Sequence, residues 1–224
     1  MAQNRDQFAF VLAALRQRLR GGAYVQGEPL TVNDLAIAWG VSATPIREAL
    51  ARLAGEGLLE DRRGRGYFAW RVDVSDLEDL YRSQNALTIA ALSSLERCSA
   101  SRAMAPGAAP LELARPARNR GTDAVEFWEA FTARVAQEAG HRFLLHAQER
   151  LADRLAPARR VEPAVLIESL GDLNGLVEAF NDRAWRQLAV DVQDFFSRRK
   201  SAAASIVDKM RTDARLYIQS IYYL

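Results

Sequence analysis

The apolar side chains between residues 31 and 57 recur at helical spacing in two short runs that a glycine separates. Leu35 and Trp39 mark one face of the first run, and Gly40 ends it because glycine readily takes the left-handed conformation of a helix C-terminus. In the second run, positions spaced as i, i+3, i+4 and i+7 are all apolar, and these are Ile46, Ala49, Leu50 and Leu53. The pattern predicts two helices joined by a tight turn.

Polar residues begin both predicted helices, and a basic segment follows the second one. Thr31 and Asn33 offer side-chain oxygens to cap the first helix, and Ser42 and Thr44 do so for the second. Pro45 suits a first turn, where its missing N–H would be unpaired anyway. After two glycines the chain predicts two short strands around a basic tip, with the tip sequence Arg62, Arg63, Gly64, Arg65 and Gly66.

A helix with a small, polar N-terminus next to an arginine suits the major groove of DNA. Its backbone N–H groups and positive dipole end can meet phosphates, and a basic wing can reach a neighbouring phosphate or the minor groove. The alternative is an ordinary helical hairpin with a basic surface turn. The predicted DNA-binding residues are Thr31, Asn33, Ser42, Ala43, Thr44, Pro45, Arg47, Arg52, Arg63, Gly64 and Arg65.

The segment VSATPIREALARLAGEGLLEDRRGRGYF resembles the winged helix-turn-helix of GntR-type transcription regulators. The resemblance implies a dimeric repressor or activator that carries an effector domain behind the wing. Two positions depart from the family pattern, because Ala43 and Asn33 stand where the family often has a DNA-contacting arginine. The usual operator sequence of the family is therefore not implied for this chain.

Helical patterns dominate the remainder of the chain. Residues 6–20 predict a first helix, and after a linker at residues 71–76 two capping boxes, Ser75 with Glu78 and Asp123 with Glu126, begin further helices. Residues 99–122 predict a loop with one or two helical turns at 111–115, and Pro157 is expected to end a helix at residues 141–155. Helices are also expected at residues 163–181 and from residue 185 onward. The fold class is therefore mainly α, with a winged helix-turn-helix at 1–71 and an antiparallel helical bundle for effector binding or dimerisation at 72–224.

Composition and charge narrow the function classes. The net charge is +2, with ten basic against seven acidic residues in 1–71, which favours a salt-sensitive phosphate contact by that region. The single cysteine, Cys98, excludes an internal disulfide framework and a cysteine-rich zinc site. No signal peptide or apolar run of membrane-spanning length is recognisable, so the chain is expected to be cytoplasmic, with no membrane partner.

The second region resembles the FCD-type effector domain at DLEDLYR, FTARVAQEAGHRFLL and LVEAF. In such domains one Asp and three His hold a metal, and their positions fall here at Trp128, Thr132, Leu173 and near Phe195. None of these is a metal ligand, so we expect no metal and no cofactor. The only histidines, His141 and His146, are five residues apart and do not share one helix face.

The residues at the lost metal positions leave two hypotheses open. In the first, side chains fill the interior of the bundle, and the region is a dimerisation domain without an effector. In the second, an apolar pocket remains, and Arg82 is the anchor for an effector carboxylate. The predicted effector-binding residues are Arg82, Trp128, Phe131, Thr132, Leu173, Trp185 and Phe195. The function expected is a dimeric repressor that binds an inverted-repeat operator in double-stranded DNA and responds to a small organic anion. A helical-bundle enzyme with an accessory N-terminal module is the alternative, but no nucleophile elbow or phosphate-binding glycine loop supports it.

Overall fold

The computed structural model describes residues 2–101, 121–166 and 170–222. The chain separates into two compact units, of which one comprises Met1–Asp73 and Val207–Leu224 and the other comprises Val74–Ile206. The predicted division into domains at residues 1–71 and 72–224 stays a prediction. Among the described residues, no helix is long and apolar enough to cross a membrane.

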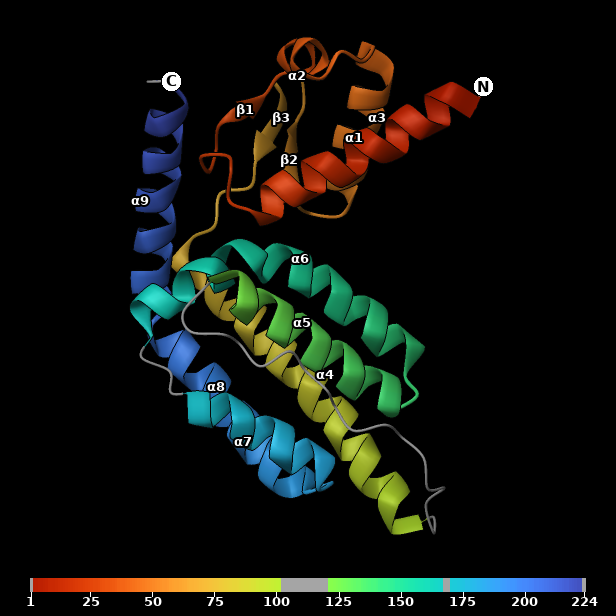
Figure 1. Cartoon of the computed structure of the whole chain (residues 1–224), viewed down its shortest axis with the longest axis vertical. Coiled ribbons are helices and arrows are strands. Elements are labelled where there is room, and N and C mark those ends of the chain that lie inside the picture. The colour runs from red at the N-terminus through yellow and green to blue at the C-terminus, as the bar shows by residue number, and fades with distance from the viewer. Residues whose placement is uncertain (1, 102–120, 167–169, 223–224) are drawn as a thin grey trace. The chain divides into compact units, whose positions relative to one another are not determined.

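The first unit contains a winged helix-turn-helix, as the sequence predicted (Figure 1). Its elements are α1 (Ala2–Arg20), β1 (Pro29–Leu30), α2 (Val32–Trp39), α3 (Ala43–Gly55), β2 (Leu59–Arg62) and β3 (Gly66–Ala69). The antiparallel sheet has the order β1-β3-β2, with Leu59 opposite Ala69 and Arg62 opposite Gly66. The predicted apolar stripe of α3 is buried and packs with the inner face of α1, whose core members are Val11 and Leu15.

Backbone conformation at two glycines explains the turns of this unit. Gly40 has φ 64° and closes α2, and the N–H of the next residue, Val41, donates to the Ala36 carbonyl at 3.2 Å. Gly64 has φ 72° at the tip between β2 and β3. The predicted N-caps were wrong in one respect, because Thr31 and Ser42 occupy the N-cap positions without a side-chain cap hydrogen bond. The Thr31 hydroxyl instead donates to the Asp34 carboxylate.

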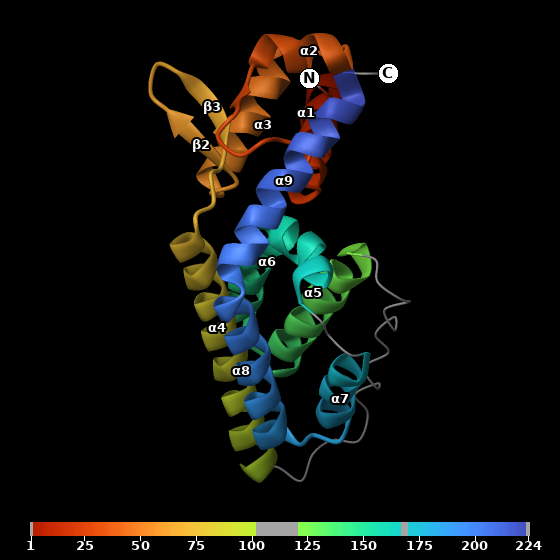
Figure 2. The same ribbon diagram turned by 90° about the vertical axis from the view of Figure 1, so that its left-hand side faces the viewer.

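The second unit is a helical bundle, which confirms the predicted architecture. Its helices are α4 (Val74–Ser101), α5 (Gly121–Glu138), α6 (Arg142–Val165), α7 (Leu170–Asn181) and α8 (Trp185–Ser201), and α9 (Ala203–Tyr222) follows. Figure 2 shows α4 and α8 lying side by side along their length and α5 beside α6, and the chain runs in opposite directions within each pair.

Several predicted helix boundaries were wrong. α4 begins at Val74 and α5 at Gly121, so both predicted capping serine and aspartate positions lie inside the first helical turn. α6 continues through Pro157 and Pro163 to Val165, and α7 begins only at Leu170. The burial of apolar side chains around Pro157 stabilises the helix enough to outweigh the hydrogen bond that a proline cannot donate. The helical turns predicted at 111–115 lie outside the described residues.

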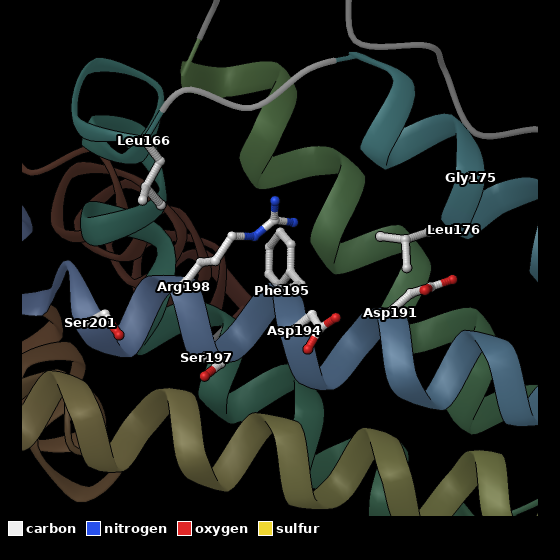
Figure 3. Close-up of a pocket in the computed structure, with 9 residues that line it drawn as sticks. All are labelled: Leu166, Gly175, Leu176, Asp191, Asp194, Phe195, Ser197, Arg198 and Ser201. Carbon is white, nitrogen blue, oxygen red and sulfur yellow. The ribbon is translucent and has the colours of Figure 1, made fainter.

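An open groove runs along one face of α8 in the second unit (Figure 3). Its volume is about 830 Å³, and its lining comes from α7, α8 and the residue that follows α6. Phe195 forms part of its wall, next to Arg198, while Asp191 and Asp194 bring carboxylates to it. None of the residues lining this groove is Arg82, which the sequence predicted as the effector anchor.

Candidate nucleic-acid interface

The N-terminal turn of α3 presents polar side chains to solvent while its other face is anchored in the core. Ile46 and Leu50 are completely buried, whereas Thr44 and Arg47 are exposed. The helical repeat produces this separation, because residues one position apart lie about 100° apart around the axis. The predicted DNA contact of Pro45 needs correction, because its side chain is buried and is not available to DNA.

The arginines of the wing have two different kinds of surroundings. Arg63 and Arg65 are exposed at the tip on either side of Gly64. Arg62 is instead held at the base, where its guanidinium lies over the Phe68 ring at 4.2 Å and donates to Glu60 through Nε at 2.9 Å and Nη2 at 2.7 Å. Both N–H groups donate to the same carboxylate oxygen, Oε2, and together they fix the direction of the guanidinium. The exposed tip arginines, rather than Arg62, are therefore available to a phosphate.

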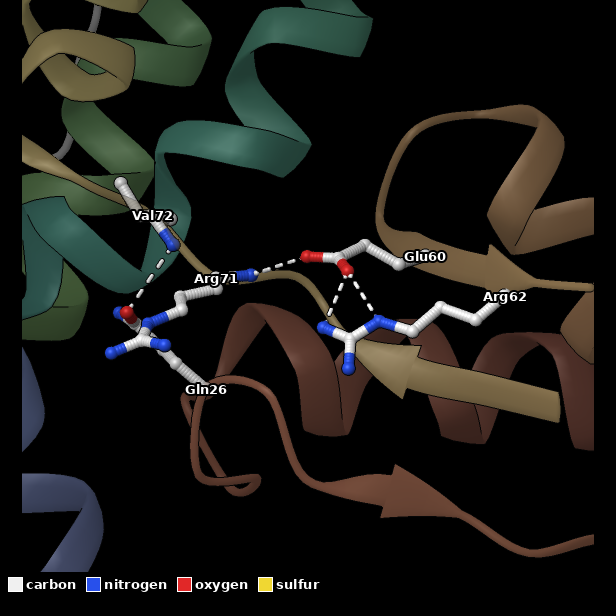
Figure 4. A network of polar contacts seen from close by, with 5 residues as sticks. All are labelled: Gln26, Glu60, Arg62, Arg71 and Val72. Carbon is white, nitrogen blue, oxygen red and sulfur yellow. Dashed lines mark hydrogen bonds and ion pairs between the residues drawn. The ribbon is translucent and has the colours of Figure 1, made fainter. Parts of the chain in front are cut away.

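Glu60 also joins the wing to the segment that leaves it (Figure 4). Its second carboxylate oxygen accepts the Arg71 backbone N–H at 3.2 Å, and the Val72 N–H donates to the Gln26 side chain at 3.2 Å. The hydrogen bond from Arg62 lowers the pKa of Glu60, and partial burial opposes this only in part. The carboxylate is thus ionised at neutral pH and fixes the base of the wing.

Two of the predicted arginines line the same hollow. Arg47 from α3 and Arg65 from the wing border a hollow of about 220 Å³, together with Thr31 and Val32 at the N-terminus of α2. Free backbone N–H groups and the positive end of the helix dipole favour an anion at such a terminus. The fold therefore brings two cations and a helix N-terminus from three separate segments to one place.

The other predicted DNA-binding residues differ in their surroundings. Asn33 and Ser42 are exposed and Ala43 is partly buried. Arg52 is exposed but forms an ion pair with Glu56 at 2.7 Å, a partner that the sequence pattern did not reveal. DNA contact by these residues stays a prediction.

The predicted effector anchor Arg82 does not face the bundle interior. About 62% of its side chain is exposed, and its guanidinium pairs with Asp79 one helical turn earlier. The other six predicted effector residues are buried, and these are Trp128, Phe131, Thr132, Leu173, Trp185 and Phe195. Trp128 packs against Phe131 and Phe195, so these side chains form part of the packed core. The prediction of an apolar wall with Arg82 as its cation is therefore wrong about the cation.

The bundle interior holds a polar cluster that the sequence pattern did not predict. Tyr81 donates to Glu162 at 2.6 Å, and the other Glu162 oxygen pairs with Arg199 Nε at 2.8 Å. Burial raises the pKa of Glu162, but the two neighbouring guanidiniums of Arg199 and Arg159 outweigh burial and lower it overall. Burial, reinforced by Glu162, holds the pKa of Tyr81 well above its usual value. Tyr81 is therefore neutral, and the ionised carboxylate lies between a phenol and a guanidinium.

A metal site is not recognisable among the described residues, where no three His, Cys, Asp or Glu side chains are grouped to hold an ion. His141 lies 2.8 Å from the Ser94 hydroxyl, and His146 pairs with Glu149 at 3.2 Å. Thr132, at one former ligand position, donates its hydroxyl to the Trp128 carbonyl at 2.8 Å. The expected absence of a metal stays a prediction.

The three-stranded wing and the anchored α3 define the N-terminal module as a winged helix-turn-helix, a class of DNA-binding domain. A family model described as bacterial regulatory proteins, gntR family, matches residues 8–68. The module is therefore a winged helix-turn-helix of the GntR type.

Curated relatives resemble this chain over the same N-terminal region. A Streptomyces ambofaciens protein described as an uncharacterized HTH-type transcriptional regulator in an unstable DNA locus is 37% identical over 81 residues, which are 36% of this chain and 34% of that protein. The Nta operon transcriptional regulator of Aminobacter aminovorans is 44% identical over 55 residues, which are 25% of this chain and 26% of that protein. The chain thus spans about a third or less of these two relatives. Both are described as transcriptional regulators and neither as an enzyme, in agreement with the predicted class.

Solved structures resemble the whole fold at low sequence identity. E. coli McbR/YncC matches with a TM-score of 0.64 and 19% identity, over 89% of this chain and 97% of that one. A Rhodococcus sp. RHA1 protein described as a GntR transcriptional regulator matches with a TM-score of 0.65 and 15% identity, over 89% of this chain and 98% of that one. At this identity the comparisons establish the fold, which joins a winged helix-turn-helix to a helical domain.

Proposed function

We propose that the protein is a sequence-specific, DNA-binding transcription regulator that acts in the cytoplasm as a homodimer on an inverted-repeat operator. The observation that carries the proposal is the hollow shared by Arg47, Arg65 and the N-terminus of α2. These groups come from the recognition helix, the wing and the helix before the turn, and all three meet one DNA backbone in winged helix-turn-helix docking. The GntR-type match of residues 8–68 supports the same reading.

The proposed dimer follows from the size of the contact. One module reaches few base pairs, whereas two modules on a twofold axis double the readout and match a palindromic site. We assign the bundle of the second unit to dimerisation and to a response to a small organic anion. Repression is the proposed sign, in which the anion favours the dimer arrangement whose recognition helices do not fit the half-site spacing. A dimer without an effector is the simpler version.

Selection of bound duplexes from a random DNA pool tests the proposal directly. We expect an enriched inverted repeat, with half-sites about 10 base pairs apart or a multiple of that spacing. Affinity for that duplex, measured by fluorescence anisotropy over a range of salt concentrations, must exceed affinity for random DNA and must fall as salt rises. If no sequence is enriched and the affinity does not depend on salt, the protein does not act through this interface.

A further inference from the structure

The groove along α8 carries more negative than positive charge. Among the described residues that line it, Asp191 and Asp194 contribute two carboxylates and Arg198 contributes one guanidinium. Both aspartates precede Phe195 on α8 and Arg198 follows it, so the carboxylates lie toward one end of the groove (Figure 3). A ligand that binds at this end therefore meets two negative charges.

The two carboxylates are close enough to hold one cationic group between them. They are three residues apart on α8, and residues at this spacing are neighbours on a helix surface, with Cβ atoms about 5–6 Å apart. Gln187 donates its Nε2 to Asp191 Oδ1 at 2.8 Å and so orients that carboxylate. A primary ammonium has three N–H donors and can donate to both carboxylates at once.

The floor of the groove beside the carboxylates is apolar. Leu176 from α7 and Phe195 from α8 line the groove, and both side chains are almost completely buried beneath its surface. Leu166 adds a partly exposed apolar side chain. A volume of about 830 Å³ is within the range of small-molecule sites, in which apolar walls surround a few polar anchors. The body of a ligand held by the aspartates therefore contacts apolar side chains.

Gly175 leaves the α7 side of the groove open. It lies within α7 and lines the groove, although alanine is the better helix former. A Cβ at this position would meet no atom of the described residues within 4 Å, so packing among them does not require a glycine here. Glycine is the default residue where another molecule approaches the backbone closely. The backbone of α7 is thus accessible to the body of a ligand.

We infer that this end of the groove binds a small primary amine in its protonated form, with an apolar body. Asp191 and Asp194 hold the ammonium, while Leu176 and Phe195 contact the body. A singly charged cation neutralises the excess negative charge of the lining, whereas an anion would add to it. The inference goes beyond the proposed function and does not depend on it, because the proposed effector is an anion and this ligand is a cation.

Ligand-observed NMR with the full-length protein, without DNA, tests the inference. The probe is phenethylamine, and its matched analogues are neutral 2-phenylethanol, anionic 3-phenylpropionate and ethylamine, which lacks the ring. We expect phenethylamine to bind with a Kd of roughly 0.1–1 mM, because the solvent that reaches both aspartates weakens their ion pairs. Each analogue should bind at least about tenfold more weakly. Absence of phenethylamine binding at about 10 mM, or equal binding of any analogue, overturns the inference.

Charge variants of the groove locate the ammonium. Asp191→Asn should weaken phenethylamine binding about threefold to tenfold, and its combination with Asp194→Asn should abolish binding. Neither aspartate is buried, so both changes are compatible with folding. Asp182→Asn removes the same charge from an exposed residue outside the groove lining and should bind phenethylamine normally. Retained binding by the double variant overturns the inference.

A variant on α7 tests the position of the ligand body. Gly175→Leu places a side chain in the open space of the groove and should weaken phenethylamine binding at least about tenfold by displacing the ring. Asn174→Leu puts the same side chain at an exposed position of α7 outside the groove lining and should leave binding unchanged. Leucine is a better helix former than either residue, so both variants should retain α7. Equal binding by Gly175→Leu and the unmodified protein would overturn the site.

Discussion

Arg47 is the single side chain on which DNA affinity should depend most. It is exposed near the N-terminus of α3, while the opposite face of that helix is locked by buried Ile46 and Leu50. Arg47→Ala should weaken operator binding by about 1–3 kcal/mol if the guanidinium reads a base edge. Anisotropy titrations with the selected operator and with random DNA measure this loss.

The comparison of operator and random DNA shows whether Arg47 contacts a base or a phosphate. A loss confined to the operator indicates a base contact, and an equal loss on both duplexes indicates a phosphate contact. Arg150→Ala, which removes an arginine from an exposed position on α6, serves as the control and should leave both affinities unchanged. Unaltered binding by Arg47→Ala would reject the docking of α3.

The two arginines Arg82 and Arg159 show how far the burial of a single side chain can be predicted from the sequence. The buried stripe of α4 passes through Leu77, Leu80, Tyr81, Gln84 and Thr88, and Arg82 lies off this stripe. Periodicity alone would have placed it outside, but the family resemblance suggested the opposite. The burial of Arg159 could not have been predicted from the sequence. Buried charged residues on α6 are of the same types as those on a solvent-exposed helix face, and only tertiary packing distinguishes them.

Among the secondary-structure elements, the wing depends on Glu60 to hold its base in place. Its carboxylate holds Arg62 and the Arg71 N–H, and the lowered pKa means that it stays ionised in the folded protein at a lower pH than in the unfolded chain. This contribution to stability is complete above the usual glutamate pKa and is lost as pH falls through the lowered value. Glu60→Gln should release Arg62 as a mobile cation. Affinity for random DNA should then rise, with a salt dependence steeper by about one phosphate contact.

The neighbouring carboxylate provides the control for the wing. Asp61→Asn removes the same charge from an exposed position on β2 and should raise random-DNA affinity without changing hydrogen exchange of the Arg71 amide. Glu60→Gln should accelerate that exchange, because the acceptor of the Arg71 N–H is weakened. Equal exchange rates in the two variants would mean that Glu60 does not fix the base of the wing.

Helix α6 illustrates a limit of local rules and yields a stability prediction. Pro157 cannot donate to the carbonyl four residues earlier, yet the helix continues because Leu155, Ala156 and Ala158 are buried around it. Pro157→Ala restores the donor and removes ring strain, a gain of up to about 3 kcal/mol. It also frees the unfolded chain at a cost of roughly 0.4–1 kcal/mol. A net gain of up to about 2–2.6 kcal/mol is expected in urea unfolding followed by circular dichroism.

A proline outside the helices tests whether the effect belongs to α6. Pro29→Ala changes an exposed strand residue and should not stabilise the protein, because no helical hydrogen bond is restored. A loss of stability in Pro157→Ala would mean that the bundle packing requires the proline ring at this position. Local sequence rules predict a helix end at this residue because they include the cost of proline but not the burial that offsets it.

For the molecule as a whole, the turn glycines, the α3 stripe and the basic tip made the DNA-binding module predictable, since each is a local signal. Gly40 takes the left-handed conformation expected, and Ile46 and Leu50 are completely buried. The interior of the second unit was less predictable because its polar cluster joins α4, α6 and α8 across long sequence separations. Tyr81, Glu162 and Arg199 meet only after those helices pack.

The assembly that binds DNA is expected to be a homodimer. A homodimer should have twice the 24.9 kDa mass of the chain in light scattering, without DNA and at micromolar concentration. The two identical modules then present the same side chains to the two halves of an inverted repeat. Changing the half-site spacing by five base pairs, about half a helical turn, places one half-site on the opposite side of the duplex and should weaken binding strongly. An insertion of about 10 base pairs restores the facing but lengthens the span, and the loss on that duplex measures how rigidly the second units hold the modules. A monomeric mass combined with full affinity for a single half-site would refute the dimer and leave a one-module contact.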